Sequence, residues 1–259
     1  MELAHIDFEV FSPLNVKTHG AARHAEPSEA DVLCMASLIR EEDPSIWLPG
    51  DPPPEDLRQW VENGGLVTAW NAEYEMEIWN TICVKRMGWF KIPFKQWRDT
   101  AAIALSLAFP ASLEKTGEAL GLDILKDKRG KHLLNKLCQP RRPSKHNSAT
   151  RWTPESAPED FHDLYEYCKQ DVRAERAIHQ ALPIDDLPPK ELAIWRMTVK
   201  MNRRGWLVDL QTAERVLKLL ADHKERALAE TAALTDYEIT SPNQIAKCLE
   251  WLRRDQGVT

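Results

Sequence analysis

The stretch ELAHIDFEVF, residues 2–11, alternates in polarity as a strand with two unlike faces does. The even-numbered residues from Ile6 to Val10 are apolar, and Asp7 and Glu9 lie between them. Because successive side chains of a strand point to opposite faces, both carboxylates project to one side, close enough to share a divalent cation. An exposed strand face with two acids would show the same pattern without any metal.

The segments that follow predict more strands and then a series of helices. We expect strands near residues 31–39, 46–48 and 66–70, and helices near 54–63, 99–108, 112–120, 130–138 and 158–181. A further amphipathic helix follows Asn71, which can act as its N-cap. Strands come first and helices surround them, which predicts an α/β fold with a mixed central sheet flanked by helices.

The chain divides in sequence into a domain of residues 1–182, a linker of residues 183–189 and a helical extension of residues 190–259. The proline-rich sequence LPIDDLPPK indicates the linker. In the extension we expect helices near 190–203 and 211–235, a short strand at 206–209 and a last helix from about residue 242.

The composition excludes several classes of protein. Five cysteines without a C-x-x-C spacing are typical of reduced core thiols rather than of zinc or disulfide frameworks. No apolar run reaches the roughly 18 residues that a membrane span needs, and the start lacks the basic region of a secretory signal. We therefore expect a soluble, cytoplasmic protein that does not contact a membrane.

The charge is unevenly distributed along the chain. The sequence has 34 Lys and Arg against 40 Asp and Glu, a net charge of −6, which argues against a simple nucleic-acid binder. Residues 126–146, however, contain eight basic residues and the single acid Asp127. This basic segment fits either a solvated helix face followed by a loop or a surface that grips a phosphate backbone.

Two more pairs of polar residues have helical spacing. Tyr167 and Asp171 are four residues apart on the clearest predicted helix, at the rim of its apolar stripe. Asn71 and Glu75 have the same spacing at the start of theirs. Each pair alone has a structural explanation, as a surface contact or as a helix cap.

Taken in order, these patterns give D-x-E in the first strand, N-x-x-Y-E at a strand-to-helix junction and Y-x-x-x-D in a late helix. In this the sequence resembles the DEDD superfamily of 3′–5′ exonucleases, in its tyrosine-bearing branch. It resembles more closely the proofreading exonuclease region of phage-encoded family A DNA polymerases. The sequence segments that carry the resemblance are IDFEVFS, AWNAEYEMEIWN, SLEKTGEALGL, KDKRGKHLLNKLC, PRRPSK, RWTPE and YEYCKQDVRAERAI.

The sequence departs from this family's pattern at three positions. Glu75 stands where the second motif usually has Asp, Trp70 where the phage group typically has His, and Val10 where it has Thr. These changes leave four acidic residues at the ligand positions.

The resemblance implies an RNase H-like fold and a two-metal hydrolysis that uses Mg²⁺ or Mn²⁺ and releases nucleoside monophosphates. Asp7 would bridge both ions, Glu9 and Asp171 would complete the first site, and Glu75 would hold the second ion through water. Tyr167 would orient the attacking water. The residues expected to contact single-stranded DNA or a DNA 3′ end are Phe8, Asn71, Tyr74, Lys131, Arg141, Arg142 and Lys145.

Residues 190–259 more loosely resemble the stretch that joins exonuclease to polymerase in family A enzymes. That family's polymerase carboxylates lie further downstream, so we expect no DNA synthesis by this chain and a polymerase domain or polypeptide as a partner, in the host cytoplasm if the protein is phage-encoded. Two alternatives stay open: an RNA-directed exonuclease of the same superfamily, and an inactive module that binds DNA or scaffolds a polymerase.

Overall fold

The computed structural model describes residues 2–40, 43–123, 130–143, 148–255 and 257. The chain forms two compact units, Met1–Arg203 and Arg204–Thr259, which we treat separately. Within the described residues, no helix has both the length and the apolar character needed to cross a membrane. The predicted domain boundaries at 182 and 190 stay a prediction.

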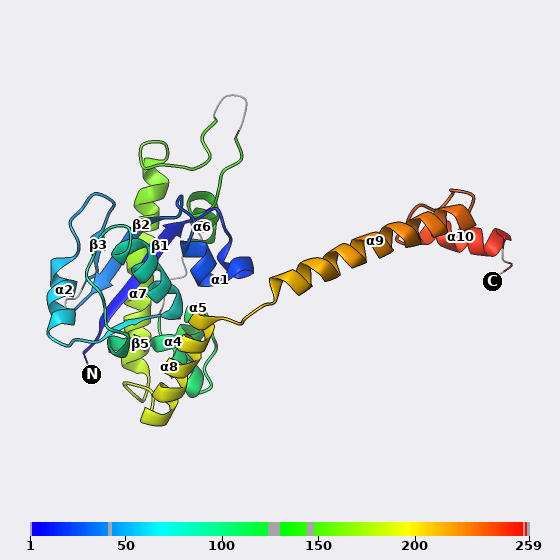
Figure 1. Ribbon diagram of the computed structural model, residues 1–259. Coiled ribbons are helices and arrows are strands. Elements are labelled where there is room, and N and C mark those ends of the chain that lie inside the picture. The colour runs from blue at the N-terminus through cyan, green and yellow to red at the C-terminus, as the bar shows by residue number, and fades with distance from the viewer. Residues whose placement is uncertain (1, 41–42, 124–129, 144–147, 256, 258–259) are drawn as a thin grey trace. The chain divides into compact units, whose positions relative to one another are not determined.

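The first unit is built on a five-stranded mixed sheet with the order β3-β2-β1-β4-β5 (Figure 1). The first three strands in this order pair antiparallel, whereas β1, β4 and β5 pair parallel. The strands are β1 (Ala4–Phe11), β2 (Asp31–Leu38), β3 (Ser45–Trp47), β4 (Val67–Ala69) and β5 (Trp97–Asp99). This confirms the predicted α/β class with a mixed sheet.

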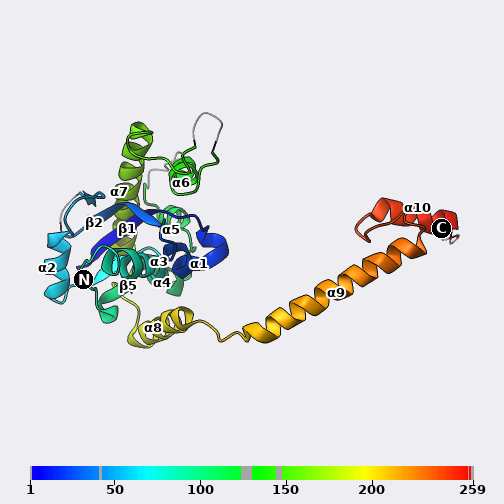
Figure 2. The ribbon, with the colours of Figure 1, turned by 45° about the horizontal axis from the view of Figure 1, so that its top comes forward.

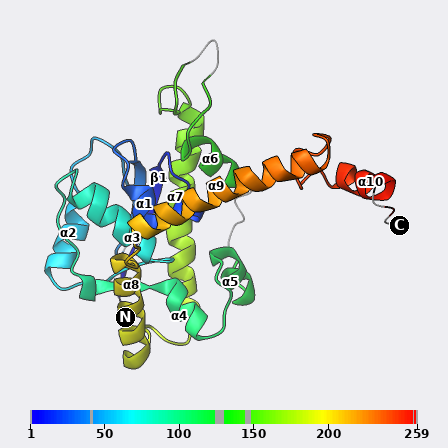
Figure 3. The ribbon, with the colours of Figure 1, turned by 45° about the vertical axis from the view of Figure 1, so that its right-hand side comes forward.

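Helices flank the sheet, as predicted. They are α1 (Val16–Ala25), α2 (Glu55–Glu62), α3 (Glu73–Ile78), α4 (Thr100–Ser106), α5 (Leu113–Ala119), α6 (Gly130–Leu137), α7 (Pro158–Ala181) and α8 (Pro189–Arg204). A π-helical turn, Trp79–Val84, continues α3. The long helix α7 crosses β1 and β2, and α6 packs on α7 (Figure 2), while α1 lies against α3 (Figure 3).

Both faces of β1 are covered, although its sequence alternates. On one face Ile6, Phe8 and Val10 join the main core, where Phe8 meets the ring of Trp79 edge-on. On the opposite face α7 is the cover, and its Cys168 and Val172 form a second cluster with β2. The polar face of β1 therefore lies beneath α7, where Glu9 is buried and Asp7 stays partly exposed.

The N-terminal half of α7 follows from its sequence. Pro158 occupies the first turn, where its missing N–H costs nothing, and Glu159 and Asp160 complement the helix dipole. Phe161, Leu164, Cys168 and Val172 of the predicted stripe are buried.

The structure corrects the prediction that Asn71 caps a helix. Asn71 is in the left-handed region with φ of 66°, and α3 begins after Ala72. The backbone N–H of Asn71 donates to Asp99 Oδ1 at 3.2 Å. Ala72 instead holds the N-cap position of α3, and no side chain caps the helix.

Helix α1 and strand β5 of this unit were not predicted. Helix α1 is weakly amphipathic and is interrupted by Gly20, which has a non-helical φ of 78°. Strand β5 has three residues, too few for a period of two to be recognised, and Asp99 at its end caps α4 by accepting from Ala102 N.

The second unit consists of helices α9 (Leu210–Leu234) and α10 (Ile245–Asp255), close to the predicted bounds. The strand predicted at 206–209 is wrong, since these described residues form neither a strand nor a helix. Asp209 instead begins α9, where its side chain accepts from Thr212 N at 3.0 Å.

Candidate metal centre

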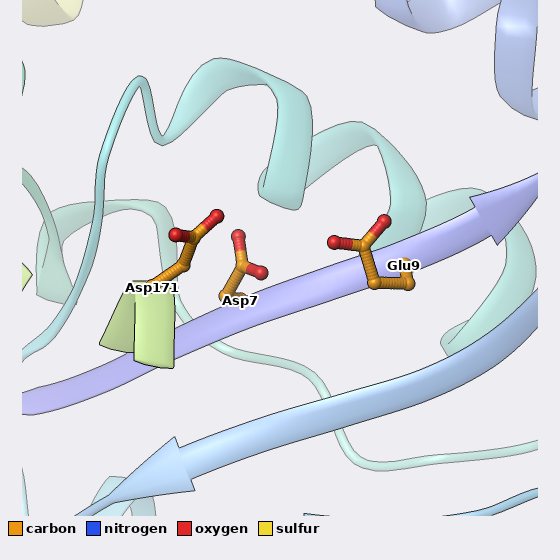
Figure 4. Close-up of side chains that lie close together, drawn as sticks. All are labelled: Asp7, Glu9 and Asp171. Carbon is orange, nitrogen blue, oxygen red and sulfur yellow. The ribbon is translucent and has the colours of Figure 1, made fainter. Parts of the chain in front are cut away.

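Three of the four predicted ligand carboxylates meet in the structure. Asp7 and Glu9 project from β1, and Asp171 projects from α7. Carboxylate oxygens of these residues all lie within 4.8 Å of one another. Figure 4 shows the Asp171 carboxylate beside that of Asp7, with Glu9 on the same side of β1. Residues separated by more than 160 positions in sequence thus form one acidic group.

The packing of β1 and α7 sets this arrangement. Asp7 pairs with Ala36 and Glu9 with Cys34 in β2, and the register shifts between Glu9 and Val10. On α7, the thiol of Cys168 donates to the backbone oxygen of Asp7 at 3.5 Å. Since Asp171 lies three residues after Cys168, the contact brings its carboxylate toward Asp7.

The electrostatics of the group favour a bound cation. Burial first, and then the charge of Asp171, raise the pKa of Asp7 well above its usual range. Burial and the charge of Asp7 do the same to the pKa of Glu9, whose Oε2 accepts a weak hydrogen bond from the thiol of Cys138 at 3.7 Å. Carboxylates this close repel one another, and a divalent cation with oxygen ligands removes the repulsion.

Glu75 is not part of the group of three, yet it lies near Asp7. Its side chain is 3% exposed, and its Oε2 has no hydrogen-bond partner among the described residues. Burial and the charge of Asp7 raise its pKa. An unpartnered buried oxygen is costly, and a water bound to a cation is a fitting partner.

Tyr167 stands beside Asp171 on α7. Burial first, and then the charge of Asp171, raise the pKa of its phenol, so the hydroxyl keeps its proton at neutral pH. The ring rests on Gly130, the first residue of α6, where a β-carbon would collide with it. The close approach fixes the ring at the edge of the carboxylates.

A cavity of about 380 Å³ adjoins the carboxylates. Phe8 and Tyr74, two of the residues predicted to contact DNA, line it together with Tyr167 and Asp171. Helix α1 and the residue before it contribute further polar lining residues, Asn15, Lys17 and His24. Their part in the cavity was missed because α1 was not predicted.

The basic residues predicted to contact DNA have different surroundings. The guanidinium of Arg141 stacks on the ring of Trp152, with 4.3 Å between its Cζ and the ring centroid, and Arg142 is exposed. Asn71, from the same predicted set, is also exposed. Lys145 and the side chain of Lys131 lie outside the described residues.

Two buried acids beside the site were missed from sequence. Asp99 accepts from Asn71 N, Ala102 N and the indole of Trp195, and burial raises its pKa to about 6. Glu175 on α7 is buried among polar partners. Its spacing of four from Asp171 was the available signal, since it places both acids on one face of α7.

The chain is similar over its whole length to a DNA polymerase. This relative, from Bacillus phage SP02, is 28% identical over 263 residues, an alignment that covers all of this chain and 39% of the polymerase. The chain thus spans about two fifths of the length of the relative it matches. No family model matches it.

Among solved structures, the chain matches one described as the POL domain of Pol1 from M. smegmatis in complex with DNA primer-template and dNTP. The identity is 18% and the TM-score 0.42, over 94% of this chain and 36% of the other.

Proposed function

We propose that this chain is a metal-dependent 3′–5′ exonuclease with an RNase H-like fold, which hydrolyses DNA from its 3′ end. The observation that carries the proposal is that carboxylate oxygens of Asp7, Glu9 and Asp171 lie within 4.8 Å of one another. Tyr167 lies beside this group on α7. Hard oxygen ligands grouped in this way suit Mg²⁺ or Mn²⁺, the ions of phosphoryl-transfer sites.

The similarity to a phage DNA polymerase supports DNA as the substrate and proofreading or repair as the setting. A nuclease that removes 3′-terminal nucleotides acts on the same end of DNA that a polymerase extends. A polymerase domain or polypeptide is accordingly the partner that we propose.

Each residue of the candidate site would have its own role in hydrolysis. Asp7, Glu9 and Asp171 would hold one ion, and Asp7 would hold the second together with Glu75, which would act through water. The ions, when bound, would neutralise the phosphate and lower the pKa of a water molecule. Tyr167 would orient that water with its protonated hydroxyl, while Phe8 and Tyr74 would contact the terminal nucleoside in the adjoining cavity.

The first test compares wild-type protein with Asp7→Ala on single-stranded DNA in the presence of Mg²⁺ or Mn²⁺. We expect hydrolysis by the wild type, none without metal and none by the variant. Glu166→Ala is the matched control, because this exposed acid precedes Tyr167 on α7 and lies outside the carboxylate group. Equal activity of wild type and Asp7→Ala would refute the assignment.

A second measurement separates the alternatives. An RNA oligonucleotide of the same sequence tests the RNA-directed reading, which predicts faster hydrolysis of RNA than of DNA. Calorimetric titration with Mn²⁺ tests the inactive module, which predicts no binding that depends on Asp7 and Asp171.

A further inference from the structure

Next to the candidate metal centre lies a cluster of buried polar groups around Glu175, whose side chain is 3% exposed. Its Oε2 accepts from His5 Nδ1 at 3.0 Å, and its Oε1 accepts from the hydroxyl of Thr100 at 2.5 Å. The hydroxyl of Thr68 lies 2.9 Å from that of Thr100 and 3.4 Å from Glu175 Oε1. Both carboxylate oxygens are therefore satisfied by the protein.

The cluster joins four elements of the first unit. His5 comes from β1, two residues before Asp7, and Glu175 comes from α7, one turn after Asp171. Thr68 lies on β4 and Thr100 begins α4. The hydrogen bond from His5 to Glu175 thus connects the same strand and helix that bring the Asp7 and Asp171 carboxylates together.

A carboxylate is a costly group to bury, and an apolar side chain would fill the same space without that cost. Polar partners provide something that apolar packing lacks, because a hydrogen bond fixes the distance and direction of the groups that it joins. A metal centre needs such precision, since its ligands from different elements must meet within tenths of an ångström.

We propose that Glu175 is a positioning residue for the metal centre. It fixes α7 against β1, β4 and α4, and so holds the Asp171 carboxylate at the distance from Asp7 at which the two share an ion. Glu175 does not itself bind metal, because both of its oxygens accept hydrogen bonds from protein donors. This inference rests on the proposed function, which supplies the metal.

The test measures Mn²⁺ binding by calorimetry in Glu175→Gln and Thr100→Val, together with kcat and KM on single-stranded DNA. We expect both variants to bind Mn²⁺ about 10-fold more weakly, as for other residues that support metal ligands. At limiting Mn²⁺ kcat should fall with KM for DNA unchanged, and excess Mn²⁺ should restore part of it. A role in folding alone would leave the metal affinity of the folded protein unchanged.

Thr116→Val is the matched control. Like Thr100, Thr116 is fully buried, and its hydroxyl donates to a backbone oxygen, that of Pro110, away from the carboxylates. We expect it to lower the melting temperature without changing the affinity for Mn²⁺. If Glu175→Gln does not fold, Thr100→Val decides the question.

The outcomes separate the two proposals. If the wild type shows no Mn²⁺ binding that depends on Asp7, the proposed function fails. If the wild type binds Mn²⁺ through Asp7 while folded Glu175→Gln and Thr100→Val bind it equally well, the positioning role of Glu175 is wrong and the proposed function stands.

Discussion

Gly130 at the start of α6 lies against the ring of Tyr167 on α7, so closely that no β-carbon fits between them. The contact places the start of α6 against the ring that carries the hydroxyl proposed to orient the attacking water. Any other residue at position 130 would bring a β-carbon into collision with the ring, so this position requires glycine.

Gly130→Ala should therefore displace the Tyr167 ring. We expect kcat to fall on the order of 10²-fold, as a displacement of about 1 Å at a reacting group can cause, and the melting temperature to fall as well. Both effects should disappear in a Tyr167→Ala background, where the ring that collides is gone. If Gly130→Ala lowers the melting temperature equally in the wild type and in Tyr167→Ala, the contact between Gly130 and the ring is not the cause.

The crowded, partly buried carboxylates predict an unusual pH dependence of stability. Because burial raises the pKa of Asp7 in the folded state, the folded protein binds more protons than the unfolded chain above about pH 4, and the free energy of unfolding falls as the pH rises. In metal-free protein, Asp7→Asn removes the ionisable group and with it this fall in the free energy of unfolding. Urea unfolding in a chelator should find the variant more stable than the wild type at pH 8 and similar to it at pH 4.

With Mg²⁺ at pH 8, the wild type should be more stable than Asp7→Asn. The ion binds and stabilises the folded wild type, whereas the variant lacks one of the carboxylates that would hold it. A wild type that is the more stable of the two in chelator at pH 8 would contradict the raised pKa of Asp7.

Asn71 allows its backbone role to be separated from its proposed contact with DNA. Its φ of 66° suits glycine and costs other residues about 1 kcal/mol or more. Asn71→Gly should keep the stability of the wild type and raise KM for DNA, whereas Asn71→Ala should lower the free energy of unfolding as well. An unchanged KM in the stable glycine variant would remove Asn71 from the DNA-binding residues.

The basic segment can be tested by the salt dependence of DNA binding. Replacing Arg141, Arg142 and Lys145 with Gln should reduce the slope of log K against log salt by about 0.7 for each lost phosphate contact on single strands. Turnover at saturating DNA should stay the same. Gln at Arg40 and Arg58, which are ion-paired with Glu2 and Glu55, serves as the control. An unchanged slope would favour a solvated surface without a role in binding.

Much of the fold could be predicted from sequence because its periods are clear. The alternation around Asp7 predicted β1, and the apolar stripe from Phe161 to Val172 predicted α7, with bounds close to those observed. The helix α1 was missed because Gly20 interrupts its pattern. The strand predicted at 206–209 was wrong because local propensity specifies no partner strand.

The candidate site was predictable only in part, for a physical reason. Spacing could place Asp7 with Glu9, and Tyr167 with Asp171, on common faces, but the meeting of the two pairs depends on how α7 packs on β1. Asp99 was missed because a buried acid that holds elements together has no local signal. Glu175 was missed although its spacing of four from Asp171 places both acids on one face of α7. Their role depends on His5, Thr100 and Asn71, which are distant in sequence.

The polarity of DNA degradation tests the central claim most directly. A single-stranded oligonucleotide labelled at its 5′ end is incubated with Mn²⁺ and wild-type protein or Asp7→Ala, and its products are separated by length. The carboxylate site predicts labelled products that shorten one nucleotide at a time with the wild type and intact DNA with the variant. Release of the 5′ label as the first product, internal cleavage, or equal shortening by Asp7→Ala would contradict it.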